Sequence, residues 1–137
     1  MKWICVLCFA VSLNVSPAKA GGTNDDQLKR GRYLVEAAGA CADCHTARDW
    51  KGTPDRGHWL QGATLDFKPS RIMPWAGFAP DIAGLPSFPD DASAVKFFET
   101  GINAAGKTCS PPMSQYRFDR DDALAVVAYL RSVPAKK

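Results

Sequence analysis

Histidine is scarce in this chain: it occurs twice in 137 residues, as His45 and His58. Two cysteines, Cys41 and Cys44, precede His45 and could form half of a zinc site, but a structural zinc site needs four Cys or His ligands. After His45 only His58 and Cys109 could complete the set, and they lie far apart in sequence. This scarcity argues against a structural zinc site.

The chain also lacks a hydrophobic run long enough to span a membrane, which takes about 20 apolar residues. Its apolar stretch from Trp3 to about Leu13 is followed at once by polar residues. With Lys2 before it and Ala18-Lys19-Ala20 after it, this stretch is typical of a secretory signal peptide. We expect residues 1–20 to be cleaved, which would place the mature chain, residues 21–137, in the periplasm.

No charge of one sign dominates the mature chain. Lys2 and Lys19 belong to the signal, so 15 of the 17 basic residues remain against 14 acidic ones, a formal net charge of +1. Near-neutrality argues against nucleic acid or an anionic membrane as the main partner. Any electrostatic attraction to a partner must come from local patches of charge.

One motif carries specific chemistry, Cys41-Ala42-Asp43-Cys44-His45, the Cys-x-x-Cys-His attachment sequence of a c-type haem. Two thiols one turn apart can each add to a haem vinyl group, and the next histidine can bring an imidazole nitrogen onto the iron. A thioredoxin-like redox pair would need a strand and helix around the motif, and no strand pattern flanks it. The motif predicts one haem c, bound covalently by Cys41 and Cys44, with His45 as the proximal axial ligand of its iron.

A low-spin electron carrier needs a second axial ligand, for which the mature chain offers Met113, Met73 and His58. Met113 follows Pro111-Pro112, which restrict the backbone before the sulfur. Met113 is therefore the expected distal ligand. Met73, His58 and an open site remain alternatives, and core packing is the commoner use of methionine. Cys109, four residues earlier, is expected to be a buried or partly covered free thiol near the haem.

Three helices are expected in a single small domain, since 117 residues are too few for two. Capping residues, apolar spacing and terminating glycine or proline predict them at about 23–38, 91–100 and 120–132. The segment 46–90 is rich in Gly and Pro and shows no sustained alternation, so loops are expected there. These loops would wrap a large cofactor with their aromatic side chains, Trp59, Phe67, Trp75 and Phe78.

Together these features resemble the class I mono-haem cytochromes c over residues 23–133. The resemblance rests on the helix leading into Cys-x-x-Cys-His, the loop-rich middle, the Pro-Pro-Met loop and the last helix with Ala128-Tyr129-Leu130. Three shorter stretches, residues 31–35, 97–101 and 122–130, are similar to the cytochrome subunits of bacterial alcohol and aldehyde dehydrogenases.

The resemblance implies an all-α, cytochrome c-like fold, with crossing N- and C-terminal helices, a middle helix and long loops around one covalent haem. Gly31 would allow the close approach of the crossing helices, with Tyr129 as its packing partner and Val126 beside it. The family also implies a proline whose carbonyl accepts a hydrogen bond from the axial imidazole, and Pro54 is the nearest candidate.

We therefore expect an electron-transfer protein rather than an enzyme: a periplasmic one-electron carrier with His45 and Met113 both on the iron. It would accept electrons from a periplasmic dehydrogenase and pass them to an oxidase or another cytochrome of the respiratory chain. One alternative is a cytochrome subunit permanently docked on a dehydrogenase. Another is a five-coordinate peroxidase or ligand-binding protein, although no distal histidine and arginine pair is evident.

A domain of this size has a thin core, so a bound haem would form a large share of its apolar interior. The haem-free chain is expected to be poorly folded. Far-ultraviolet circular dichroism of the haem-free protein should show much less helix than the loaded protein, and equal helix content in both would contradict the expectation.

Overall fold

The computed structural model describes residues 23–136, so the expected signal peptide, residues 1–20, lies outside the described residues. The elements run in the order α1, η1, α2, η2, β1, β2, α3, α4. Helices carry the fold and the two strands have two residues each, which confirms the all-α class. In this part of the chain, no helix has the length and apolar character needed to cross a membrane.

The first expected helix is present but changes type near its end. α1 spans Asn24–Tyr33, and η1, a π-helical turn over Leu34–Ala38, continues it. Thr23 caps α1 in a reciprocal arrangement with Asp26, in which each side chain accepts a hydrogen bond from the other residue's backbone N–H. The Gly39 N–H reaches the carbonyl five residues back at 2.7 Å, which gives this turn its π geometry.

The other two expected helices are confirmed at their expected bounds, α3 at Asp91–Thr100 and α4 at Arg120–Ser132. Asp90 and Asp119 cap them, each accepting a hydrogen bond from the backbone N–H three residues later. Gly101 ends α3 at a φ of +69°, a left-handed conformation that favours glycine.

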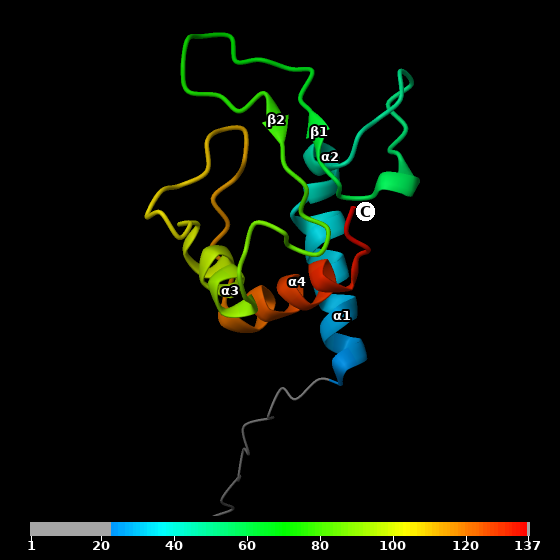
Figure 1. Cartoon of the computed structure of the whole chain (residues 1–137), viewed down its shortest axis with the longest axis vertical. Coiled ribbons are helices and arrows are strands. Elements are labelled where there is room, and N and C mark those ends of the chain that lie inside the picture. Colours follow the sequence, from blue (N-terminus) through cyan, green and yellow to red (C-terminus); the bar gives the residue numbers. More distant parts are fainter. Residues whose placement is uncertain (1–22, 137) are drawn as a thin grey trace, which may run out of the picture.

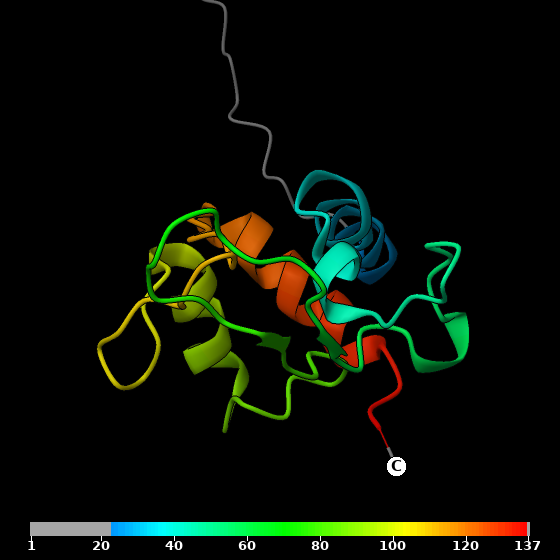
Figure 2. The same cartoon turned by 90° about the horizontal axis from the view of Figure 1, so that it is seen from above.

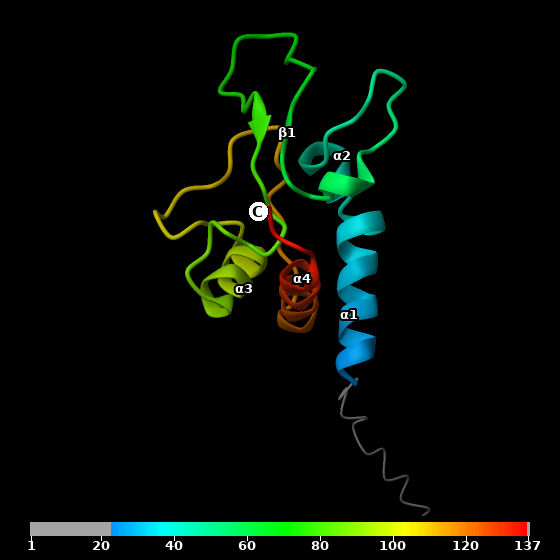
Figure 3. The same ribbon diagram turned by 45° about the vertical axis from the view of Figure 1, so that its right-hand side comes forward.

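α1 and α4 cross at close range, and α3 lies on the other side of α4 (Figures 2 and 3). A Cβ at Gly31 would lie 1.9 Å from the Ala125 carbonyl oxygen and 2.8 Å from the Tyr129 Cβ. The expected close approach at Gly31 and its packing against Tyr129 are confirmed. The atom nearest to Gly31 is the backbone carbonyl of Ala125, and Val126 is buried in the core.

The core lies between these helices and under the loops that follow the Cys-x-x-Cys-His motif. Phe97 and Phe98 of α3 form an aromatic pair in it, with ring centroids 5.3 Å apart. Loops contribute as well as helices, because Leu60 and Leu85 are almost completely buried. Both leucines have a positive φ, 60° and 54°, so the loop backbone bends sharply to bring them inward.

Residues 46–90 are mostly loop, as expected, but they include a small antiparallel sheet that the sequence did not predict. β1 (Ala63–Thr64) pairs with β2 (Phe78–Ala79), and a short 3₁₀ turn, η2, spans Arg56–His58. Strands of two residues are too short to show alternation. They close the base of residues 65–77, called here the β1–β2 loop, which projects away from the helices (Figure 1).

Gly31→Ala is expected to lower the free energy of unfolding by about 3 kcal/mol, because the added methyl group would force α1 and α4 apart. Denaturant unfolding of both proteins measures the change. Gly77→Ala is the matched control, since a Cβ at Gly77 meets no atom within 4 Å. An equal loss of stability in the two variants would contradict the importance of the crossing.

Candidate functional site

The Cys-x-x-Cys-His motif forms a short helix of its own, α2, at Cys41–His45. Ala40 turns the chain between η1 and α2 with a left-handed φ of 48°. Cys41 and Cys44 are half-buried free thiols, and a separation of three residues places them on one face of the helix. α2 therefore presents two thiols about one helical turn apart, with His45 directly after them.

The His45 imidazole is buried, with 4% of the residue exposed, and its Nδ1 lies 2.7 Å from the Pro80 carbonyl oxygen. A carbonyl can only accept a hydrogen bond, so Nδ1 carries the proton and the neutral ring keeps its lone pair on Nε2. Among the side-chain hydrogen bonds of residues 23–136, the His45 ring takes part in this one through Nδ1 and in none through Nε2. The ring is thus fixed in the tautomer that a metal-binding imidazole requires.

The proline that orients His45 is Pro80, so the expectation that Pro54 does so is wrong. Pro54 pairs with Arg48 across an isolated β-bridge. Pro80 instead directly follows β2, while Gly62, just before β1, donates its N–H to the His45 carbonyl at 2.9 Å. Pairing of β1 with β2 therefore brings Pro80 to a histidine 35 residues earlier in the chain.

Burial keeps the imidazole and one thiol of the motif uncharged. It lowers the pKa of His45, although the hydrogen bond to Pro80 acts in the opposite direction. Burial also raises the pKa of Cys41 to about 11, with a hydrogen bond to Tyr116 opposing the shift. At neutral pH the imidazole is therefore in its neutral, metal-binding form and Cys41 is a thiol.

Met113, the first candidate for the second axial ligand, is half-buried and lies in a turn that its own N–H closes by donating to the Ser110 carbonyl at 3.2 Å. The Pro111 carbonyl accepts a hydrogen bond from the Ala76 N–H of the β1–β2 loop at 2.7 Å. This bond joins the segment that carries Met113 to the loop that carries Met73.

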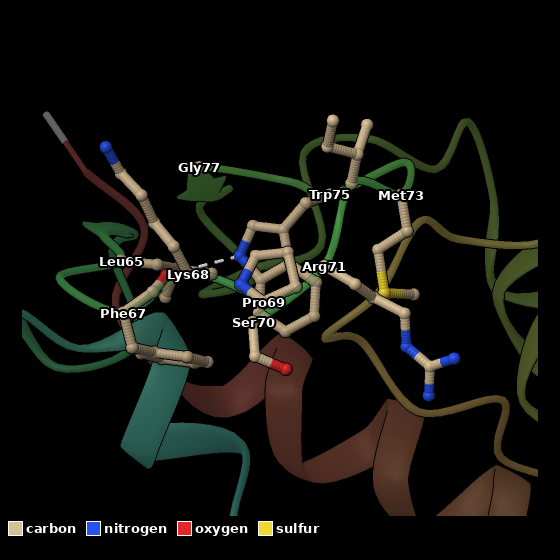
Figure 4. A pocket seen from close by; sticks show the side chains of 10 residues that line it. Leu65, Phe67, Lys68, Pro69, Ser70, Arg71, Met73, Trp75 and Gly77 are labelled. Carbon is tan, nitrogen blue, oxygen red and sulfur yellow. Dashed lines mark hydrogen bonds between the residues drawn. The ribbon is translucent and has the colours of Figure 1, made fainter.

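The two other candidates are more exposed. Met73 is 40% exposed and lines a pocket of about 520 Å³ on the β1–β2 loop, where it points to the same side as Arg71 (Figure 4). His58 is exposed, and its Nδ1 lies 2.7 Å from the Asp55 carboxylate. Neither the pocket around Met73 nor the hydrogen bond of His58 involves a residue of α2.

Tyr116 connects the segment of Met113 to the start of the haem motif. Its hydroxyl donates to the Gly39 carbonyl, and a Cβ at Gly39 would lie 3.4 Å from both the Tyr116 Oη and the Cys41 Sγ. Its ring stacks on Phe118, with centroids 5.2 Å apart, and burial raises the pKa of Tyr116 to about 12. The sequence shows that an aromatic residue follows Met113, but no feature of the sequence predicts that its hydroxyl bonds to the Gly39 carbonyl.

Cys109 is half-buried and packs against the hydrophobic core, as expected for a partly covered thiol. Burial raises its pKa, so it is a thiol at neutral pH. In the part of the chain that the structure describes, it forms no disulfide.

The donor set fits a covalently held haem better than a bare metal ion. Among residues 23–136, no three Cys, His, Asp or Glu side chains gather into a group suited to a metal ion. Cys41 and Cys44 can form two thioether bonds from one face of α2, and the Nε2 of His45 is free to bind iron. These three residues are the ones that would hold a haem c.

Known proteins with similar sequences point to the same chemistry. The profile of the cytochrome c family matches residues 28–134. The cytochrome subunit of fructose dehydrogenase from Gluconobacter japonicus is 35% identical over 120 residues, which cover 83% of this chain and 24% of that protein. A diheme c-type cytochrome from Cereibacter sphaeroides is 29% identical over 124 residues, which cover 78% of this chain and 36% of that protein. The chain thus spans well under half the length of these relatives.

Tyr116→Phe is expected to reduce the free energy of unfolding by about 1 kcal/mol, because the Gly39 carbonyl loses its donor while the ring still stacks on Phe118. Amide hydrogen exchange in residues 110–118 should also become faster, which mass spectrometry would detect.

Tyr129→Phe is the control for this experiment, since it removes a hydroxyl that donates to Glu36 at the helix crossing. It should leave exchange in residues 110–118 unchanged. If both substitutions speed exchange there equally, Tyr116 does not hold this segment.

Proposed function

The chain belongs to the cytochrome c family, and on this premise we propose that it carries single electrons in the periplasm on one haem c per chain. Its family and its two cytochrome relatives indicate electron transfer rather than catalysis on a substrate. The observation that carries the proposal is the buried His45 with its Nδ1 held by Pro80, since this leaves Nε2 for an iron atom.

We assign the covalent attachment to Cys41 and Cys44 and the proximal axial position to His45. When bound, the haem supplies a one-electron Fe(III)/Fe(II) couple. The Pro80 carbonyl fixes the orientation of the His45 ring and makes Nε2 a better electron donor. Burial of the ring keeps bulk water away from this side of the site.

Met113 is the proposed distal axial ligand. Its segment is held at three points: by its own turn, by the hydrogen bond from Ala76 to Pro111, and by the hydroxyl of Tyr116 on Gly39. A thioether is a weak ligand, and a fixed backbone helps to keep it in place. Histidine and methionine together raise the reduction potential above that of a two-histidine site, which suits an acceptor of electrons from a dehydrogenase.

The location and partners are also proposals. Lys2, the apolar run that follows it and Ala18-Lys19-Ala20 favour export to the periplasm with cleavage after residue 20. A dehydrogenase is the proposed donor because one relative is the cytochrome subunit of a fructose dehydrogenase. An oxidase or another cytochrome of the respiratory chain is the proposed acceptor.

The same relative favours a second candidate function, a cytochrome subunit that stays docked on its dehydrogenase. The two functions use the same haem site and differ only in the lifetime of the complex. A dehydrogenase that stays bound to the chain through gel filtration would favour the docked subunit over the free carrier.

Met113→Ala is expected to abolish the weak charge-transfer band that a thioether ligand gives ferric haem at the red end of the visible spectrum. Its reduction potential should also fall, because the remaining ligand set favours ferric iron. Visible spectra and redox titration of the haem-loaded protein measure both effects.

Met73→Ala is the matched control and should keep the band and the potential. Loss of the band in Met73→Ala but not in Met113→Ala would assign the distal position to Met73. A wild-type protein without the band would contradict methionine ligation altogether.

A further inference from the structure

Only two polar residues are buried in the part of the chain that the structure describes, His45 and its neighbour Thr46. The proposed function accounts for the first of them. Thr46 is 1% exposed, and its Oγ1 accepts a hydrogen bond from the Leu60 N–H at 3.0 Å. Burial of a hydroxyl is costly unless the group is hydrogen-bonded. The bond from Leu60 therefore indicates that this part of the loop is held in a fixed position behind the axial histidine.

Leu60 passes this connection on to a third segment. Its side chain is completely buried, and its φ of 60° is a left-handed conformation that is unfavourable for leucine and persists only where the surroundings hold it. Its N–H is bonded to Thr46, and its carbonyl accepts hydrogen bonds from the N–H groups of Ile82 and Ala83 at 2.9 and 3.1 Å. Leu60 thus joins the residue after the axial histidine to the residues that follow Pro80.

Gly62 makes a second connection between the same two segments. Its N–H donates to the His45 carbonyl at 2.9 Å, and its φ is +87°. A Cβ at this position would lie 2.9 Å from the Ala79 carbonyl oxygen and 3.1 Å from the carbonyl carbon of Pro80. The backbone of Gly62 therefore packs against the same carbonyl group that accepts the hydrogen bond from the His45 ring.

Residues 60–62, called here the bridging turn, thus contact both partners of the imidazole hydrogen bond. The His45 Nδ1 lies 2.7 Å from the Pro80 carbonyl oxygen. Pairing of Ala63 with Ala79 continues the contact into β1 and β2, directly beside the turn and Pro80. The strength of a hydrogen bond falls steeply as its distance and angle depart from the optimum. The position of the bridging turn therefore decides how strongly Pro80 acts on the imidazole.

We propose that the bridging turn, fixed by the Thr46 hydroxyl, holds the Pro80 carbonyl against the His45 ring and thereby sets the reduction potential of the haem. Thr46, Leu60 and Gly62 are positioning residues, because they act through His45 and Pro80. This inference rests on the proposed function and adds the residues that tune its one-electron couple.

The direction of the effect follows from the charge on the ring. A strong hydrogen bond from Nδ1 makes Nε2 a better electron donor, which stabilises ferric iron more than ferrous iron. A looser contact between Pro80 and His45 weakens this stabilisation, so the reduction potential rises. Loss of such a supporting contact typically changes metal affinity at least tenfold. A tenfold change in the ratio of the ferric and ferrous affinities corresponds to about 59 mV for one electron.

Simple support of the loop is the alternative role for these residues. A buried threonine and a closely packed glycine can stabilise a fold without acting on the imidazole. That role predicts a lower free energy of unfolding at an unchanged reduction potential. The proposal predicts a change of the potential itself and of the solvent exchange of the His45 ring proton, which a purely structural role would leave alone.

Thr46→Val removes the acceptor but keeps the shape of the side chain, so the Leu60 N–H is left buried without a partner. In the haem-loaded protein, redox titration should show a potential about 59 mV higher than in the wild type. By NMR of the reduced protein, the His45 ring N–H should exchange with solvent about tenfold faster. Thr46→Ser keeps the hydroxyl and should restore both values.

Thr23→Val is the control for a general loss of stability. It removes the hydroxyl that caps α1 by accepting a hydrogen bond from the Asp26 N–H, at the end of α1 remote from the haem motif. This variant should unfold more easily and leave the potential and the ring N–H exchange unchanged. A Thr46→Val potential at or below that of the wild type would overturn the proposal, as would an equal rise in Thr23→Val.

Gly62→Ala acts on Pro80 directly, since its methyl group would press on the Pro80 carbonyl, and it should also raise the potential. Gly52→Ala is the matched control, because Gly52 has a similar φ of +82° but a Cβ there meets no atom within 4 Å. Both substitutions strain the backbone, and only the one at Gly62 should shift the potential. An equal shift in both would overturn the proposal. If Gly62→Ala does not fold, the result for Thr46→Val stands by itself.

Failure of the proposed function would give a different result. A chain that binds no haem at Cys41 and Cys44, or whose haem shows no reversible one-electron couple, would contradict the proposed function and this inference with it. A reversible couple whose potential and ring N–H exchange are the same in Thr46→Val and the wild type would contradict only the role of the bridging turn.

Discussion

The close crossing of α1 and α4 is the constraint on which the rest of the structure depends. The Gly31 backbone packs directly on the carbonyl of Ala125, and next to it Arg30 forms a bidentate ion pair with Asp122 at 2.7 and 2.8 Å. Since η1 continues α1 directly and only Gly39 and Ala40 separate η1 from α2, the crossing also decides where the haem motif lies. A rotation of α1 would carry Cys41 and His45 away from the segments that meet them.

Hydrogen bonds between distant segments complete the site around that motif. The His45 imidazole bonds to the Pro80 carbonyl, and the Tyr116 hydroxyl bonds to the Gly39 carbonyl. The Ala76 N–H donates to the Pro111 carbonyl. Long loops would ordinarily be costly in a domain with a thin core, because their ordering loses conformational entropy. These bonds fix the loops at the points where the proposed ligands lie, and the proposed haem would supply the apolar surface that the small core lacks.

The distribution of charge follows from the same local rules. Acidic residues gather at the helix N-termini because they accept hydrogen bonds from the free N–H groups there and because the positive end of the helix dipole stabilises their negative charge. Asp90 and Asp119 are examples, each bound to a backbone N–H of its helix. Among the described residues, Lys68 and Arg71 of the β1–β2 loop take part in no salt bridge. A requirement of helix stability thus leaves a positive surface beside the proposed electron-transfer site.

The sequence by itself determined the elements whose signals are local. The helices at 91–100 and 120–132 could be predicted to the residue, because caps, apolar spacing and terminators lie within each segment. The haem motif could be predicted for the same reason, since both thiols and the imidazole lie within five residues. Tertiary structure alone decided that Pro80 rather than Pro54 orients His45, and that Tyr116 reaches Gly39. These contacts join backbone carbonyls to side chains 35 and 77 residues away. Every residue has a backbone carbonyl, so the sequence does not single one out, and only the packing of the chain decides which carbonyl accepts each hydrogen bond.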